Sequence, residues 1–189
     1  MTGSKPNSAV IATPLGDLSI YAAVDGLTEI AFAAIAPDRE LARQTLAEAL
    51  LPTDTAPSTI ELRYLHSDHP QIEQHLSDAV KQLSEYFQGQ RREFQLVLAP
   101  QGTKFQQQVW QLLQQIPYGQ TWSYGEQANQ LGNANASRAV GAANGKNPLA
   151  IVVPCHRVIA ANQRLTGYAG GLSRKLWLLR FEQSFDRNE

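Results

Sequence analysis

The sequence contains a single cysteine, Cys155, among its 189 residues. One cysteine cannot form a disulfide within the chain, and it cannot supply a zinc site built from several thiolates. Cys155 is therefore either a packed structural thiol, the commoner fate of a lone cysteine, or a reactive group. His66, His69 and His75 are better explained as side chains of a polar loop and helix than as metal ligands, so the sequence predicts neither a metal site nor a cofactor.

Long apolar runs are also absent. No stretch approaches the about 20 consecutive apolar residues that a membrane-spanning helix needs. Residues 1–8 are polar, and no apolar signal core follows them. The hydrophobic fraction of 43% is enough for a sizeable core and argues against a disordered chain. We therefore expect a cytoplasmic protein with one large domain or two small ones.

Acidic residues are scarce in the second half of the chain. Residues 1–100 hold 13 acidic and 7 basic side chains, a net charge of −6, whereas residues 101–189 hold 4 and 9, a net charge of +5. This segregation favours two functional regions, of which the second faces an anionic partner; the alternative is a chance cluster on a solvated face. The short linker Pro100-Gln101-Gly102 lies where the balance changes sign. We therefore predict an N-terminal domain at 1–100 and a C-terminal domain at 101–189.

The first half combines β-strand and helix patterns. Apolar or β-prone runs separated by turn sequences predict a meander of three strands at 10–13, 18–23 and 27–32. Further elements are predicted on spacing and composition: a helix that opens at Pro37, a loop at 51–59, a helix at 71–87 and a strand at 94–98.

The second half is predicted to be mostly helical. Thr103 and Ser123 are candidate N-caps, the first for a helix that runs to the Pro-Tyr-Gly sequence at 117–119. Helices at 124–131 and 136–145 are separated by a tight turn at Gly132, which is a helix-turn-helix pattern. A final helix is predicted at 172–183.

The second helix of this pattern is built from small residues. Seven of its ten residues are Ala, Ser or Gly, and its one basic side chain is Arg138. Such a helix can enter a narrow DNA groove, with Arg138 as a probe. Small residues equally permit close helix–helix packing inside a protein, and composition alone favours that second interpretation.

Cys155 is followed directly by His156. The thiolate is the nucleophilic form of cysteine, and a free thiol titrates near about 8.5, so a nucleophilic Cys155 needs a base. Neighbouring residues on an extended segment point to opposite sides, which makes a direct hydrogen bond awkward. A bridging water or a turn after Pro154 would connect the two groups. Glu182, on the inner side of the last predicted helix, is the best candidate for an acid that orients His156.

The segment Ile151-Val152-Val153-Pro154-Cys155-His156-Arg157-Val158 resembles the active-site motif of the O6-alkylguanine-DNA alkyltransferases, also called methylated-DNA–protein-cysteine methyltransferases. Further motifs of that family recur in its order and spacing across the second half: Phe105-Gln106-x-x-Val109-Trp110, Ile116-Pro117-Tyr118-Gly119, Ser123-Tyr124, Ala136-Ser137-Arg138-Ala139-Val140-Gly141, Asn147-Pro148, Gly167-Tyr168-x-Gly170-Gly171-Leu172 and Lys175-x-Trp177-Leu178-Leu179-x-x-Glu182. The first half resembles the family's N-terminal domain more loosely. The resemblance implies an α+β protein: an N-terminal ribonuclease-H-like α/β domain, then a mostly helical C-terminal domain with a winged-helix-like helix-turn-helix.

The resemblance also implies a function. Members of the family move an alkyl group from O6 of guanine, or O4 of thymine, in double-stranded DNA to their own cysteine, once per molecule and without a cofactor. The O6 atom lies inside the paired stack, so the nucleotide must be flipped out. The implied protein is a monomer that binds the minor groove and no membrane.

Residue roles follow from the same resemblance. Cys155 matches the nucleophile, His156 the water-linked base and Glu182 the acid that orients it. The other matched catalytic residues are Asn147, which ties the helix-turn-helix to the active-site segment, Tyr168, a hydroxyl donor to guanine, and Lys175, a charge near the pocket. The matched DNA-binding residues are Tyr124, which crowds the 3′ phosphate, Arg138, which fills the vacated stack, and Ala136, Ser137 and Gly141.

The substrate pocket implied by the resemblance is lined by Tyr124, Val158, Tyr168 and Ala169. The backbone carbonyls of Cys155 and Val158 would accept hydrogen bonds from the guanine amino group. Ala169 replaces a Ser of some members, and Ala150 replaces a Pro. These two departures leave the preference among methyl and bulkier adducts open.

Two other functions compete with alkyl transfer. Alkyltransferase-like lesion sensors keep the fold but lack the nucleophile, so the presence of Cys155 argues against a sensor. A Cys-His hydrolase would need a direct Cys–His contact and an oxyanion hole. Because Cys155 and His156 are adjacent in the sequence, a direct contact is awkward, which argues against a hydrolase.

Overall fold

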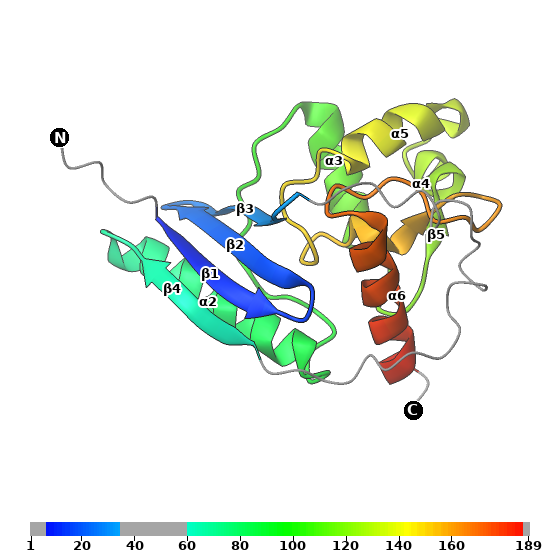
Figure 1. Ribbon diagram of the computed structural model, residues 1–189. Coiled ribbons are helices and arrows are strands. Elements are labelled where there is room, and N and C mark those ends of the chain that lie inside the picture. Colours follow the sequence, from blue (N-terminus) through cyan, green and yellow to red (C-terminus); the bar gives the residue numbers. More distant parts are fainter. Residues whose placement is uncertain (1–6, 35–59, 187–189) are drawn as a thin grey trace. The chain divides into compact units, whose positions relative to one another are not determined.

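The computed structural model describes residues 7–34 and 60–186, and these form two compact units. One unit comprises residues 7–33 and 60–101, and the other holds residues 102–186 (Figure 1). The helix predicted to open at Pro37 and the loop predicted at 51–59 lie outside the described residues. The domain limits 1–100 and 101–189 therefore stay a prediction for the whole chain.

The first unit is built on a four-stranded antiparallel sheet. Its strands are β1 (Ser8–Thr13), β2 (Gly16–Ala23), β3 (Gly26–Phe32) and β4 (Glu61–His66), in the order β3-β2-β1-β4. The first three strands confirm the predicted meander. Alternate side chains of β1 and β2, among them Ile11, Leu18 and Ile20, are fully buried.

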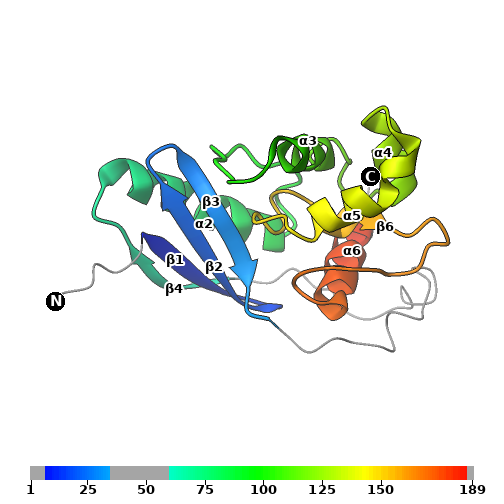
Figure 2. The same cartoon turned by 90° about the horizontal axis from the view of Figure 1, so that it is seen from above.

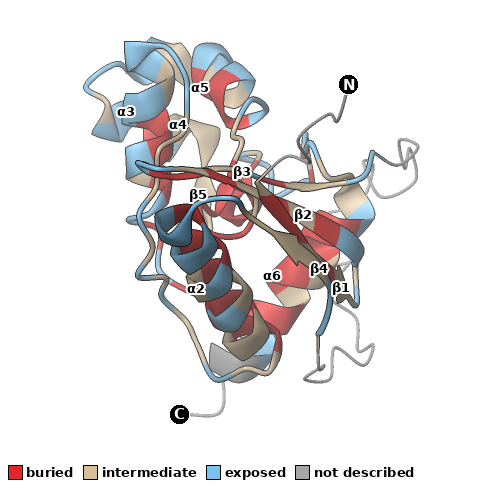
Figure 3. Ribbon diagram, turned by 90° about the vertical axis from the view of Figure 1, so that its left-hand side faces the viewer, coloured by how far each residue is buried: buried red, intermediate tan, exposed pale blue. Residues whose placement is uncertain are grey.

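Helix α2 (Pro70–Phe87) packs along this sheet and closes its core. It begins after the N-cap His69, whose Nδ1 accepts a hydrogen bond from the Gln71 amide at 3.2 Å. Ile72, Leu76 and Leu83 are buried, and Figure 3 shows buried and exposed residues alternating along the helix. The helix predicted at 71–87 is confirmed. His75 also faces inward, with its Nε2 at 3.2 Å from the Val24 carbonyl oxygen.

Two sequence-based assignments in this unit need correction. Residues 94–98 are not a strand: only Leu98 forms a bridge, with Leu27, because the Gln82 side chain occupies both backbone polar groups of Gln95 at 2.8 Å. Strand β4 was missed. It is a largely exposed strand at the edge of the sheet. A register shift between Val10 and Ile11 of the neighbouring β1 also weakens the alternation of buried and exposed side chains along β4.

The second unit is mostly helical. Its helices are α3 (Lys104–Leu113), α4 (Tyr124–Gln130), α5 (Ser137–Asn144) and α6 (Leu172–Asp186). Short 3₁₀ turns lie at η2 (Ala134–Ala136) and η3 (Cys155–Arg157), and two short strands, β5 (Trp122–Ser123) and β6 (Val158–Ile159), pair in parallel.

Both N-caps predicted in the second unit are confirmed, and each forms a capping box. Thr103 exchanges hydrogen bonds with Gln106, and Ser123 exchanges them with Glu126. Helix α3 ends at Leu113, earlier than predicted, because the Leu112 and Leu113 carbonyls accept from amides three residues ahead in a tighter turn.

Helices α3, α4 and α5 form a tight cluster that includes the predicted helix-turn-helix (Figure 2). Buried side-chain hydrogen bonds hold it: Trp110 Nε1 donates to the Ala143 carbonyl at 2.9 Å, and Asn144 Nδ2 donates to Gln127 Oε1 at 2.8 Å. Val140 and Ala143 of α5 are buried in this cluster, whereas Arg138 and residues 139 and 142 are exposed. The small residues of α5 thus serve close packing on one face and leave a low-relief surface on the other.

In the part of the chain that the structure describes, no helix combines the length and the apolar character that crossing a membrane requires.

Substitution of Gly26 tests the close packing of the β2–β3 turn against Val97 in the first unit. Its φ is +139°, and an added Cβ would lie 2.6 Å from the Val97 carbonyl oxygen, which is held by the Leu27 amide at 2.8 Å. Gly26→Ala should lower the free energy of unfolding by about 2 kcal/mol or more, since backbone strain and overpacking each cost about 1–3 kcal/mol. Urea denaturation followed by circular dichroism measures this. The control Gly145→Ala has a φ of −65° and no contact under 3.6 Å, and it should stay within about 0.5 kcal/mol of the parent protein; equal effects of the two variants would contradict the argument.

Candidate active site

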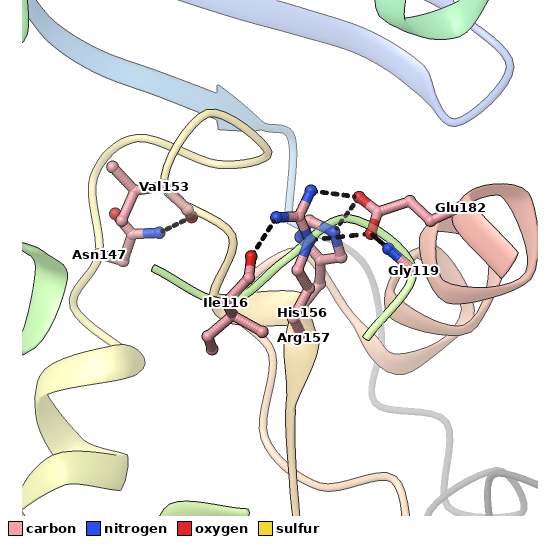
Figure 4. A network of polar contacts seen from close by, with 7 residues as sticks. All are labelled: Ile116, Gly119, Asn147, Val153, His156, Arg157 and Glu182. Atoms are coloured by element: carbon pink, nitrogen blue, oxygen red, sulfur yellow. Dashed lines mark hydrogen bonds and ion pairs between the residues drawn. The ribbon is translucent and has the colours of Figure 1, made fainter. Parts of the chain in front are cut away.

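Cys155 begins the turn η3 inside a fully buried segment, residues 151–159. Asn147 shapes the chain that leads to it. The Asn147 Oδ1 accepts from the Leu149 amide at 3.0 Å, and its Nδ2 donates to the Val153 carbonyl at 2.7 Å and to Cys155 Sγ at 3.1 Å. Figure 4 shows the bond to Val153. One amide side chain therefore fixes both the turn and the position of the sulfur.

The environment of the thiol opposes its ionisation in the resting protein. Burial raises the pKa of Cys155, while the Asn147 amide and the Lys175 ammonium lower it. Because burial is the largest of these effects, the resting side chain is a protonated thiol. The same two neighbours stabilise the thiolate once a base removes the proton.

The tautomer of His156 leaves one ring nitrogen able to accept a proton. His156 is fully buried, and its Nε2 lies 2.9 Å from Glu182 Oε1. A carboxylate only accepts hydrogen bonds, so Nε2 carries the proton and Nδ1 keeps its lone pair. Nδ1 is buried and has no hydrogen-bond partner within the described chain. Burial lowers the pKa of His156 although Glu182 raises it, and the ring is therefore neutral and able to accept a proton.

The carboxylate of Glu182 accepts hydrogen bonds from several of the described residues (Figure 4). Besides that of His156, they come from Arg157 Nε at 2.8 Å, Arg157 Nη2 at 3.0 Å and the Gly119 amide at 3.2 Å. Burial raises the pKa of Glu182, but the interactions with His156 and Arg157 outweigh burial and lower the pKa to about 2. Glu182 is thus an anion that stays ionised inside the protein.

Arg157 is the residue of this cluster that sequence reasoning did not identify. Its Nη1 also donates to the Ile116 carbonyl at 2.7 Å, and its guanidinium carbon lies 5.6 Å from the centre of the Tyr118 ring. The only signal in the sequence is its place next to His156. That signal does not reveal a partner 25 residues away.

Lys175 is a buried cation that connects two backbone segments next to Cys155. It is fully buried, and its Nζ donates to the Val158 carbonyl at 2.6 Å and to the Thr166 carbonyl at 2.7 Å. Burial lowers its pKa to about 8, and Cys155 raises it. The resemblance implies that the Val158 carbonyl oxygen accepts a hydrogen bond from the guanine amino group. In this structure the same oxygen accepts from Lys175, and a carbonyl oxygen can accept two hydrogen bonds.

Two tyrosines complete the group around the sulfur. The Tyr168 hydroxyl is buried and has no hydrogen-bond partner in the described residues. The Tyr168 and His156 rings pack edge to face, with their centroids 6.5 Å apart. Burial raises the pKa of Tyr168 well above the usual value. Tyr124, the first residue of α4, contacts Thr166 through its hydroxyl, and burial raises its pKa. Ala169, next to Tyr168, is exposed.

The structure thus brings together the matched residues of the catalytic group: Cys155, His156, Glu182, Asn147, Tyr168 and Lys175. It does not bring Arg138, Ala136 or Ser137 to them. These lie at the start of α5, where Arg138 is exposed and the other two are half-buried. Gly141 approaches the site only through Tyr124, since an added Cβ would meet that ring at 3.6 Å. The buried cluster can perform nucleophilic attack by sulfur with the proton taken up by His156.

Comparison with known proteins gives matches over both units. Residues 8–100 match the family model for the ribonuclease-like domain of 6-O-methylguanine DNA methyltransferase, and residues 104–184 match the model for its DNA-binding domain.

Relatives and solved structures agree with these models. The methylated-DNA–protein-cysteine methyltransferase of Methanosarcina acetivorans is 55% identical over 112 residues, which cover 59% of this chain and 72% of that protein. Its counterpart in Mycobacterium bovis is 58% identical over 108 residues, covering 57% and 66%. Among crystal structures, Mycobacterium tuberculosis OGT in complex with DNA has a TM-score of 0.70 at 40% identity, covering 93% of this chain and 92% of that one.

The pairing of Arg157 with Glu182 makes a prediction about stability. Arg157→Met keeps most of the side-chain volume but leaves a buried carboxylate without its main counter-charge, which costs about 3–5 kcal/mol of the free energy of unfolding. Guanidinium chloride denaturation measures the loss. The exposed Arg164→Met is the matched control and should change the value by no more than about 0.5 kcal/mol. A loss for Arg157→Met no greater than that of the control would show that the ion pair does not support the fold.

Proposed function

The chain belongs to the methylated-DNA–protein-cysteine methyltransferase family, and from this premise we propose that it repairs DNA by moving the alkyl group of O6-alkylguanine onto Cys155. It is a DNA-binding enzyme, as the sequence predicted. The observation that carries the residue assignment is the buried sulfur held by Asn147 beside the hydrogen-bonded His156–Glu182 pair. The O4 position of thymine is a second substrate of the same chemistry.

Access to the lesion requires that the nucleotide leave the stack. The exposed face of α5 offers small side chains and one long cation, Arg138, to the minor groove. In this proposal Arg138 occupies the vacated space, Ala136, Ser137 and Gly141 allow close approach of the helix, and Tyr124 crowds the phosphate at the pocket entrance. Val158, Tyr168 and Ala169 complete the pocket.

The transfer then proceeds by a proton shift and a displacement. The thiol proton passes through a water molecule to His156 Nδ1, and the charge on the ring is balanced by Glu182 through Nε2. The thiolate attacks the alkyl carbon, a carbon–sulfur bond forms, and the carbon–O6 bond breaks with its electron pair left on guanine. The proton held by His156 returns to the departing guanine and restores its neutral form, and the Tyr168 hydroxyl, which has no partner among the described residues, donates a hydrogen bond to the guanine ring. The thioether is stable, so each molecule acts once.

The two alternatives fit the site less well. A lesion sensor would lack the nucleophile, whereas Cys155 is present with its activating partners. A hydrolase would require the cysteine and histidine to be hydrogen-bonded directly, whereas His156 Nδ1, the nitrogen left to accept a proton, has no hydrogen-bond partner among the described residues. Cytoplasmic location and a monomeric state remain predictions of this proposal.

Intact-mass measurement tests the reaction. Incubation with duplex DNA containing O6-methylguanine should add one methyl group to the protein at Cys155, with saturation at one per molecule. Cys155→Ala should gain no mass and should still bind the duplex in a gel-shift assay, because binding depends on α5 and on charge. Continued turnover beyond one equivalent, or methylation of the Cys155→Ala variant, would refute the assignment.

The role of Arg138 is tested by comparing two substrates. Arg138→Ala should slow transfer from duplex DNA by about tenfold or more, since flipping costs a few kcal/mol and each 1.4 kcal/mol is a factor of ten. Transfer from the free O6-alkylguanine base needs no flipping and should be unchanged. Arg164→Ala removes an exposed positive charge of the same unit and serves as the control. Equal slowing on both substrates would reject the role in flipping.

A further inference from the structure

Thr166 lies where three elements of the second unit meet. It is half-buried in the loop between β6 and α6, and it lies just before the Gly167-Tyr168 motif. Its carbonyl accepts from Lys175 Nζ at 2.7 Å and from the Tyr124 hydroxyl at 3.5 Å. Its own hydroxyl donates to the Tyr124 hydroxyl at 3.4 Å. One residue therefore connects the first turn of α4 with α6 and with the loop that leads to Tyr168.

Tyr124 is confined by this contact and by one more. The ring lies against α5, where an added Cβ on Gly141 would be 3.6 Å from the ring carbons. The hydroxyl lies against Thr166 and close to Gly167, where an added Cβ would be 3.9 Å away. Glycine on both sides leaves room for the ring, so the hydrogen bonds of Thr166 are the directional restraint on the Tyr124 hydroxyl.

The anchoring of Thr166 makes this restraint effective. Its carbonyl is fixed by the buried Lys175, which is in turn held by the Val158 carbonyl at 2.6 Å. A threonine side chain has few χ1 states, so a fixed backbone also fixes its hydroxyl. None of the hydrogen bonds of Cys155, His156 and Glu182 described above involves Thr166.

We propose that Thr166 is a positioning residue for lesion capture, whose hydroxyl holds the Tyr124 hydroxyl at the pocket entrance before the flipped nucleotide arrives. The proposal rests on the proposed function, because it assigns Thr166 an action through Tyr124 on the DNA. Thr166 acts on the binding of the lesion and not on the activation of the thiol.

Single-turnover kinetics on a duplex with O6-methylguanine, at a series of DNA concentrations, separate these two effects. Thr166→Val removes the hydroxyl and keeps the shape. It should raise the DNA concentration for half-maximal rate by about two- to tenfold, the effect of one neutral hydrogen bond. The limiting rate and its pH dependence should not change. Thr166→Ser restores a hydroxyl and should behave as the parent protein.

A double-mutant cycle with Tyr124→Phe tests whether Thr166 acts through Tyr124. In the Tyr124→Phe background, Thr166→Val should have no further effect. The proposal is overturned by three results: a Thr166→Val variant equal to the parent, a Thr166→Ser variant as impaired as Thr166→Val, or an undiminished effect in the Tyr124→Phe background. Absence of methyl transfer by the parent protein would instead overturn the proposed function.

Discussion

The second unit depends on one buried charge, the carboxylate of Glu182. An ionised group inside a protein is tolerated only when its lone pairs are occupied by donors. Glu182 meets this condition with the bidentate guanidinium of Arg157, the imidazole of His156 and the Gly119 amide. These donors come from the segment after α3 and from η3, and the carboxylate itself belongs to α6, so satisfying it also fixes three parts of the chain. The proton on His156 Nε2, and the free lone pair on Nδ1, follow from that arrangement.

The same burial that creates this pair keeps the sulfur inactive at rest. Cys155 is surrounded by buried residues, which raise its pKa, and its activating groups act only on the ionised form. A thiol of this kind reacts poorly with electrophiles in solution. Reaction requires the alkyl carbon next to the sulfur and, at the same time, a route for the thiol proton to His156. In the proposed function, capture of the flipped nucleotide brings both together. The burial of the site therefore contributes selectivity as well as structure.

Much of the second unit was predictable because its signals are local. Thr103 and Ser123 cap their helices through bonds to residues three positions ahead, and such spacing is visible in a sequence. Arg157 and Thr166 act on partners 25 and 42 residues away, and nothing local distinguishes them. In the first unit, β4 was not predicted because the side chains of an exposed edge strand need not alternate between apolar and polar. Residues 94–98 were wrongly predicted as a strand because the Gln82 side chain takes both backbone polar groups of Gln95, which leaves only a single bridge from Leu98 to Leu27. Glu182 was already the best candidate for the acid that orients His156, but spacing alone left the Cys–His geometry open, and the water-linked role of His156 came from the resemblance in motif.

The short parallel pair β5–β6 has a mechanical consequence. Trp122 pairs with Val158, and Ser123 pairs with Ile159. Helix α4 begins directly after the first strand, and η3, with Cys155 at its start, ends directly before the second. The backbone just before α4 is therefore hydrogen-bonded to the backbone just after Cys155, although the paired residues lie 36 positions apart along the chain. The turn between α4 and α5 lies outside this pair, so a change in its length would leave the connection between the start of α4 and the segment of Cys155 in place.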